Sequence, residues 1–262
     1  MKSTARQDAE GARRRVSGIR IGISACLLGQ EVRFDGGHKR DAFLTGVLAP
    51  HVQWVPVCPE VEVGMGTPRE TLRLVREDGR IRMVTTHSLI DHTDAMNAWA
   101  SRRVDALTRE DLDGYVLKKD SPSCGMEHVK VYASDGTGVG DGRGLFADAL
   151  IRRLPLLPVE EEGRLRVASL RESFIERVFA HRHLKDLFRA RWSMGSLVRF
   201  HEAHRASLLA HSTSGCEELE RLLTEAAHLP KPELRTRYEA QFMTTLAVPA
   251  TTRRDRSLIP DL

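Results

Sequence analysis

Short apolar runs, separated by polar and turn-forming residues, recur along the first 160 residues of the chain. Three of them, at 20–25, 53–57 and 114–118, are largely apolar throughout, which is typical of short strands buried in a parallel sheet. A fourth run at 154–160 contains two prolines, and proline within a strand favours an edge position. The pattern therefore predicts four strands, the last of them at an edge.

Helical patterns lie between these strands. The apolar residues of 93–108 fall near one face of a helix, and a second helix is expected at 145–153. The glycine-rich loop at 135–144 lacks the Gly-Lys-Ser/Thr ending of a P-loop, so it does not indicate a nucleotide site. Buried strands that alternate with helices favour an α/β unit with a mostly parallel sheet.

A β-hairpin is predicted between the second strand and the first helix. The runs 72–75 and 81–84 flank Asp78 and Gly79, a residue pair typical of hairpin turns. A further short strand is expected at 129–132, before the glycine-rich loop.

The character of the chain changes at 161–169, where we place a domain boundary. Beyond it strand signals vanish, helical periodicity continues, and histidine and arginine crowd together. The predicted fold is therefore a Rossmann-like α/β domain at 19–160, followed by a small all-α domain at 170–262. Residues 1–18 are polar and basic and are expected to form a disordered arm.

Composition excludes some classes of protein. The 262 residues are 41% hydrophobic and 29% charged, which fits a globular domain with a sizeable core. No apolar run reaches the ~20 residues of a membrane span. The net charge of +4 permits a polyanionic partner without establishing one. Four cysteines without paired spacing are not a secreted disulfide framework, so a reducing cytoplasm is expected.

Three cysteines follow predicted strands, and each lies in a polar turn. They are Cys26, Cys58 and Cys124, and the chain has one other, Cys216. Because the carboxyl ends of parallel strands meet at one edge of a sheet, the three thiols are expected to converge. They suit an iron–sulfur cluster, or a zinc ion with His38 or His128 as a further ligand. The alternative is three buried cysteines that act as small apolar residues.

The residues around these cysteines resemble the thiouracil desulfidase family over 19–160. The resemblance rests on Ser-Ala-Cys-Leu-Leu-Gly at 24–29, Cys-Pro-Glu at 58–60, Thr-Pro-Arg at 67–69 and Asp-Ser-Pro-Ser-Cys-Gly at 120–125. The segment 170–262 contains Phe-Ala-His-Arg-His-Leu at 179–184 and Phe-His at 200–201. With these pieces it resembles the YbgA-type helical domain fused to desulfidases that act on 4-thiouridine in tRNA. Its pattern breaks after Leu246, so a shortened helical domain is expected.

The resemblance implies a cofactor, a substrate class and roles for particular residues. It implies a 4Fe-4S cluster held by Cys26, Cys58 and Cys124. The substrate would be a thiolated uracil base or nucleoside, with tRNA as a partner of the helical domain. Glu60 would activate water or relay a proton, and Ser121 would assist proton transfer or orientation. The residues expected to contact substrate are Arg33, Asp35 and Arg69.

Simpler interpretations and other functions stay open at this stage. Asp35 is equally suited to closing a type I turn. The simpler interpretation of Arg69 is a solvated loop arginine, which the motif around it favours less. A zinc hydrolase could use the same cysteines. A non-catalytic RNA-binding protein could carry a structural or redox-sensing cluster, and in that case it would not need Glu60.

Overall fold

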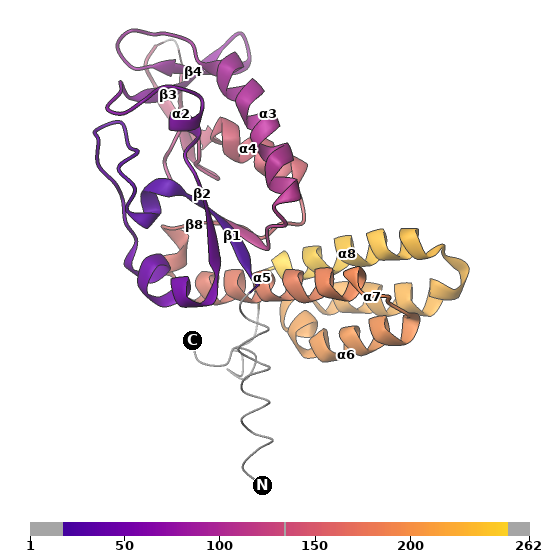
Figure 1. The fold of residues 1–262 in the computed structure, drawn as a ribbon. Coiled ribbons are helices and arrows are strands. Elements are labelled where there is room, and N and C mark those ends of the chain that lie inside the picture. The colour runs from indigo at the N-terminus through magenta and orange to yellow at the C-terminus, as the bar shows by residue number, and fades with distance from the viewer. Residues whose placement is uncertain (1–17, 134, 251–262) are drawn as a thin grey trace, which may run out of the picture. The chain divides into compact units, whose positions relative to one another are not determined.

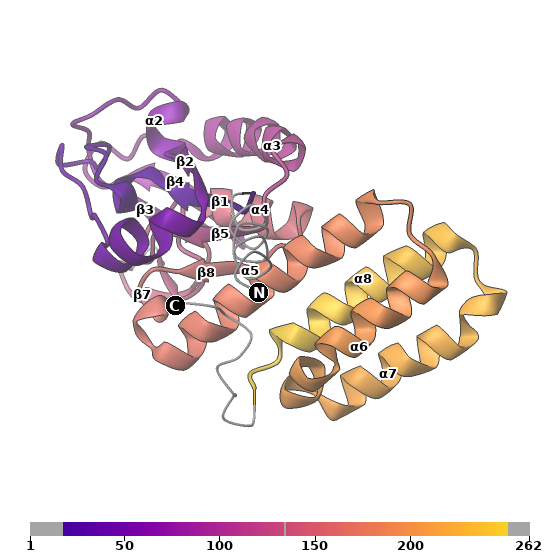
Figure 2. The ribbon, with the colours of Figure 1, turned by 60° about the horizontal axis from the view of Figure 1, so that its bottom comes forward.

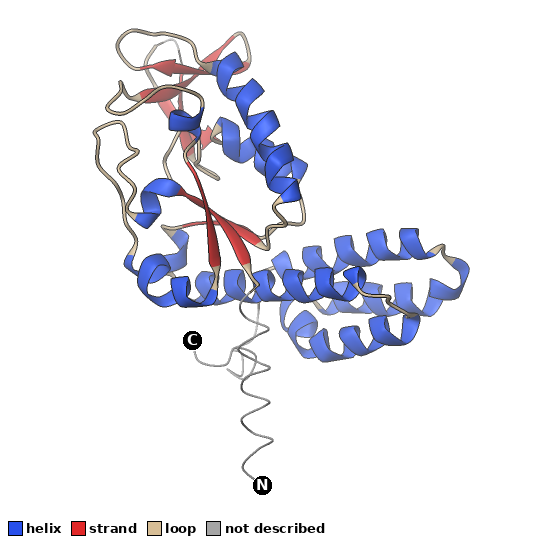
Figure 3. Ribbon diagram, viewed as in Figure 1, coloured by secondary structure: helices blue, strands red, loops and turns tan. Residues whose placement is uncertain are grey.

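The computed structural model describes residues 18–133 and 135–250 (Figure 1). The chain divides into two units between Arg166 and Val167. Strands occur only in the first unit and helices make up the second, within the described residues (Figure 3). The predicted combination of an α/β domain and a helical region is confirmed. The predicted arm lies outside the described residues, except for Gly18.

The first sheet is entirely parallel, in the order β2-β1-β5-β8. Its strands are β1 (Arg20–Ser24), β2 (Gln53–Val57), β5 (Gly114–Leu117) and β8 (Val159–Glu161). The central strands β1 and β5 are covered on both faces, and every residue of β5 is buried. β8 lies at the edge of the sheet, as expected, but it is shorter than the predicted 154–160, because both prolines lie in the turn before it and Pro158 directly precedes its first residue.

A second sheet has the order β4-β3-β6-β7. It contains the predicted hairpin, whose strands β3 (Leu72–Glu77) and β4 (Arg80–Thr85) are antiparallel, together with β6 (Val129–Tyr132) and β7 (Gly138–Gly142). The turn residues Asp78 and Gly79 have φ values of 48° and 74°, as a type I′ turn requires.

Strand β7 corrects the prediction of a loop at 135–144. Its sequence, Gly-Val-Gly-Asp-Gly, has little strand propensity of its own. It pairs closely with β6, where a Cβ atom on Gly142 would lie 2.4 Å from a methyl group of Val131. The glycines permit this close approach of side chains from β6, and a pattern of apolar residues does not reveal it.

Two helices contribute to the core of the first unit. They are α3 (Thr93–Arg109) and α4 (Leu145–Arg153), close to the predicted 93–108 and 145–153. Trp99 of α3 and Tyr115 of β5 both pack against Phe146 of α4, with ring centroids 5.5 and 5.8 Å apart. The core is continuous through both sheets, and it fixes the ends of the strands that carry the cysteines.

The second unit contains four α-helices within the described residues (Figure 2). They are α5 (Ala168–Arg189), α6 (Met194–His211), α7 (Thr213–Glu225) and α8 (Lys231–Ala247). Ser193 and Ser212 cap the starts of α6 and α7. Buried aromatic residues from α5 and α8, including Phe174, Tyr238 and Phe242, contribute to its centre. None of the described helices combines the length and apolar composition that a membrane span requires.

Candidate metal centre

Three cysteines lie at the carboxyl edge of the parallel sheet. Cys26 is in the 3-10 helix η1 (Ala25–Leu28), directly after β1. Cys58 follows β2 as the N-cap of the short helix α2 (Pro59–Glu62), and Cys124 lies in the turn after β5. Since β1 pairs in parallel with both β2 and β5, these strand ends share one edge. All three cysteines line one cavity of about 370 Å³.

The environment of the thiols is apolar but contains nearby charges. Burial raises the pKa of Cys26 to about 11, and the Lys118 ammonium group opposes this shift. Burial also raises the pKa of Cys58, and it raises the pKa of Cys124 well above the usual range. Each of the two other thiols adds to the shift at Cys124. A bound cation would favour the thiolate forms that burial opposes.

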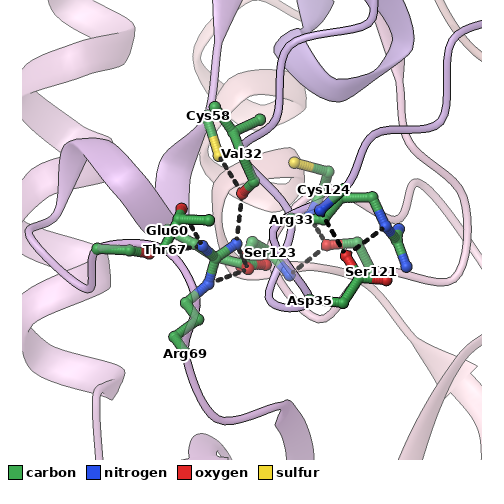
Figure 4. Close-up of polar contacts among 12 residues, drawn as sticks. Val32, Arg33, Asp35, Cys58, Glu60, Thr67, Arg69, Ser121, Ser123 and Cys124 are labelled. Atoms are coloured by element: carbon green, nitrogen blue, oxygen red, sulfur yellow. Dashed lines mark hydrogen bonds and ion pairs between the residues drawn. The ribbon is translucent and has the colours of Figure 1, made fainter.

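Glu60 lines the same cavity and forms an ion pair with Arg69 (Figure 4). The Nε and Nη2 groups of Arg69 both donate to Glu60 Oε2, the former at 2.9 Å. Nη2 also donates to the carbonyl of Val32, and Nη1 donates to Gly66 O and Thr67 Oγ1. The Arg69 side chain is only 7% exposed, so it is not a solvated loop arginine. Its donors are directed at Glu60 and the surrounding loops.

The two serines of the Ser-Pro-Ser-Cys segment have different partners. Ser123 is fully buried, and its hydroxyl donates to Glu60 Oε1 at 2.9 Å. Ser121 lines the cavity, and its Oγ accepts hydrogen bonds from the backbone N–H groups of Ser123 and Cys124, at 3.2 and 3.1 Å. The hydroxyl hydrogen-bonded to Glu60 is therefore that of Ser123, which the sequence analysis did not single out.

The start of α4 holds the turn that carries Cys124. The N–H groups of Leu145 and Phe146 donate to the carbonyls of Pro122 and Ser123 at 3.1 and 3.0 Å. A Cβ atom on Gly144 would lie 2.5 Å from the Ser123 carbonyl group, so this position requires glycine. The last glycine of the glycine-rich segment therefore allows α4 to pack against the cysteine turn.

Arg33 and Asp35 occupy different positions relative to the cavity. Arg33 lines it, stacks on Phe34 at 5.1 Å and lies 3.5 Å from Asp35 Oδ1. Asp35 is exposed, is not among the lining residues, and accepts a hydrogen bond from Gly37 N at 3.1 Å. It thus closes a turn, and a substrate contact from Asp35 stays a prediction.

Lys118 is a further residue of the cavity lining. Its side chain is 16% exposed, and its Nζ lies 2.6 Å from Glu162 Oε1. His38 and His128, the alternative ligands, are exposed and do not line the cavity. His38 Nδ1 instead accepts from Arg40 N, and His128 Nδ1 pairs with Gly140 O.

Residues 21–162 match the model of the 2-thiouracil desulfurase family. The chain belongs to this family. Among solved structures it is similar to the 4Fe-4S-dependent thiouracil desulfidase TudS, with 31% identity over 59% of this chain and 98% of that one, and a TM-score of 0.46. No curated protein matches it. The resemblance to desulfidases over 19–160 is confirmed, whereas that of 170–262 to a YbgA-type domain stays a prediction.

Proposed function

We propose that this member of the 2-thiouracil desulfurase family removes sulfur from thiolated uracil, using a 4Fe-4S cluster held by Cys26, Cys58 and Cys124. The observation that carries the proposal is the joint presence of these three thiols and the Glu60 carboxylate around one cavity. Its volume of about 370 Å³ lies within the range of roughly 300–1,000 Å³ typical of small-molecule sites.

The donor set fits an iron–sulfur cluster better than a zinc ion. Thiolates are soft ligands suited to iron–sulfur clusters, and neither His38 nor His128 lines the cavity. The zinc alternative needs one of these histidines as a further ligand, so their positions outside the cavity lining weigh against a zinc hydrolase.

The overall reaction exchanges sulfur for oxygen without net oxidation or reduction. Water adds to the ring carbon that carries sulfur, the carbon–sulfur bond breaks, and the products are uracil and hydrogen sulfide. When bound, a cluster with three protein ligands supplies one iron as a Lewis acid towards the soft thiocarbonyl sulfur. The chain itself must then bind the ring, activate water and move protons.

In this proposal Glu60 takes the proton of the attacking water. Arg69 binds one carboxylate oxygen and Ser123 the other, so the group is held in one orientation at the cavity. Ser121 already accepts two backbone N–H groups, which leaves its own hydroxyl hydrogen to donate towards the pyrimidine. Arg33, in the loop that follows η1, lines the same cavity and can donate a hydrogen bond to a carbonyl oxygen of the substrate ring.

An assay with three thiolated compounds tests this proposal directly. Protein reconstituted anaerobically is incubated with 2-thiouracil, 4-thiouracil and 4-thiouridine, and sulfide and the oxygenated product are both quantified. We expect equal amounts of the two products, with activity lost in Cys124→Ala and retained in Cys216→Ala. A cluster-loaded protein that releases no sulfide from any of the three compounds would contradict a desulfidase.

We further propose that 4-thiouridine in tRNA is a substrate when the helical unit contributes binding. The support is the resemblance of 170–262 and its arginine and histidine content. Phosphate contacts would make the preference for tRNA over nucleoside shrink as salt rises. Equal rates on tRNA and nucleoside at low salt would restrict the enzyme to small thiouracils.

A further inference from the structure

A second group of metal-ligating side chains lies in the helical unit, among residues for which the desulfidase reaction has no use. His201 of α6 and Cys216 and Glu220 of α7 bring one nitrogen, one sulfur and one carboxylate oxygen within 4.8 Å of one another. Among the residues that the structure describes, these three form the group of metal-ligating side chains that could hold an ion.

The helices account for this convergence. Cys216 and Glu220 are four residues apart on α7, so they lie on the same helix face one turn apart. Ser212 caps this helix and sets the position of its first turn, because its hydroxyl accepts from Gly215 N at 3.0 Å. His201 faces them from α6. Cys216 and His201 are buried, whereas the Glu220 side chain is 40% exposed, which leaves an open side for an ion.

His201 has an unused nitrogen directed at this group. Its Nε2 is shielded from solvent and has no hydrogen-bond partner, although the side chain is 2% exposed. The nearest carboxylate oxygen, Glu220 Oε1, is 3.9 Å away. Its Nδ1 lies 3.2 Å from the hydroxyl of Tyr238.

We propose that His201, Cys216 and Glu220 bind a zinc ion that links α6 to α7, with water as the fourth ligand. A mixed nitrogen, sulfur and oxygen donor set suits Zn²⁺ among divalent ions. Tetrahedral zinc would place these ligand atoms roughly 3.3–3.6 Å apart. The separations from Glu220 Oε1 are 3.9 Å to His201 Nε2 and 3.8 Å to Cys216 Sγ. Small side-chain rotations close that difference.

Neighbouring residues resemble the outer partners of a metal site. Tyr238 holds the ring of His201 through Nδ1, leaving Nε2 for the ion. Arg205 donates to Glu220 Oε1 at 2.8 Å. A carboxylate oxygen has more than one lone pair, so Oε1 can accept from Arg205 and bind zinc while Arg205 orients the group.

The test uses the full chain carrying Cys26→Ala, Cys58→Ala and Cys124→Ala, in which Cys216 is the remaining one of four cysteines. Cobalt is titrated as a spectroscopic substitute for zinc, and zinc affinity is measured by competition with a chromophoric chelator. We expect one ion per chain and a thiolate-to-cobalt charge-transfer band. Tyr238→Phe should weaken zinc binding by about 10–100-fold, and the exposed His228→Gln should not change it.

Variants of the ligands decide the outcome. His201→Gln and Glu220→Gln should each reduce the affinity more than Tyr238→Phe does. The absence of a charge-transfer band in the folded protein, or unchanged affinity in both ligand variants, would overturn the proposal.

A measurement on the wild-type chain does not depend on folding of the triple variant. Zinc should slow amide hydrogen exchange in α6 and α7, and Cys216→Ser should remove that protection. Protection that survives Cys216→Ser, or that never reaches these helices, would overturn the proposal as well. Neither measurement requires desulfidase activity, so the two proposals fail independently.

Discussion

Ser123 donates a hydrogen bond to Glu60 at 2.9 Å, across a sequence separation of 63 residues. This contact joins the turn after β5 to the helix after β2, and each of these segments also carries a cysteine. Arg69 holds the other oxygen of the same carboxylate. The acid/base group is thus fixed by the segments that supply the thiols, so that metal ligands and carboxylate are positioned together.

Glu60→Gln should preserve the cluster and remove most of the activity. The amide keeps the shape of the side chain but cannot accept a proton, and losing a general base commonly lowers the rate about 10²–10⁴-fold. Visible absorption and iron content report on the cluster, and sulfide release reports on activity. A Glu60→Gln enzyme with near-normal turnover and full iron would exclude Glu60 from the mechanism.

The two serines of the cysteine turn should differ in what they affect. Ser121→Ala leaves the N–H groups of Ser123 and Cys124 without their acceptor. An unsatisfied buried donor costs about 1–3 kcal/mol of stability, which here falls on the turn that carries Cys124. The variant should therefore lose iron more readily, and activity with it. Ser123→Ala should keep its iron and slow turnover, because its hydroxyl contacts Glu60 and Met83 and does not support the backbone of the cysteine turn. Iron loss in Ser123→Ala with stable iron in Ser121→Ala would reverse this assignment.

Arg69→Lys should impair catalysis although it keeps the positive charge. The lysine ammonium cannot make the planar set of contacts that Arg69 makes to Glu60, Val32 and Gly66. Misplacement of Glu60 should lower kcat about 10- to 100-fold, with a smaller change in KM. A larger change in KM than in kcat would indicate instead that Arg69 contacts substrate.

The predicted strands agree with the structure where β-branched and aromatic residues recur in a short run. The bounds of β2 and β6 match those expected, and in both strands buried residues alternate with exposed or partly exposed ones, as in a strand with one covered face. The pattern did not reveal β7, nor that the hairpin belongs to a separate sheet. Both depend on pairing between distant segments, which a local pattern does not encode.

The site shows the same division between local and tertiary information. The convergence of the thiols could be predicted from the sequence, because the cysteines follow parallel strands. The sequence could not show which serine contacts Glu60, because Ser121 and Ser123 lie in the same turn. Only the path of the folded chain brings the Ser123 hydroxyl to Glu60. Similarly, Cys216 gave no signal in the sequence, since His201 meets it only when α6 and α7 pack.

His204 should make the unfolding free energy depend on pH. Burial lowers its pKa, the carbonyl of Phe200 opposes that shift, and His183 adds to it; Glu176 and His201 also act on the ring. The unfolded chain therefore binds the proton first as pH falls through about 6.5. Stability is full above that pH and is lost below it.

Denaturant unfolding of the full chain between pH 7.5 and 5.5, with a chelator present, measures this dependence. His204→Gln should reduce the slope, since the amide does not titrate. A slope that is unchanged in His204→Gln would assign the pH dependence to other groups.

Iron content tests the central claim most directly. Wild-type protein, Cys124→Ala and Cys216→Ala are reconstituted anaerobically, and iron and acid-labile sulfide are counted per chain. We expect about four of each in the wild type and in Cys216→Ala, as one cubane requires, and little of either in Cys124→Ala. A full complement of iron and sulfide in Cys124→Ala would contradict a cluster held by Cys26, Cys58 and Cys124.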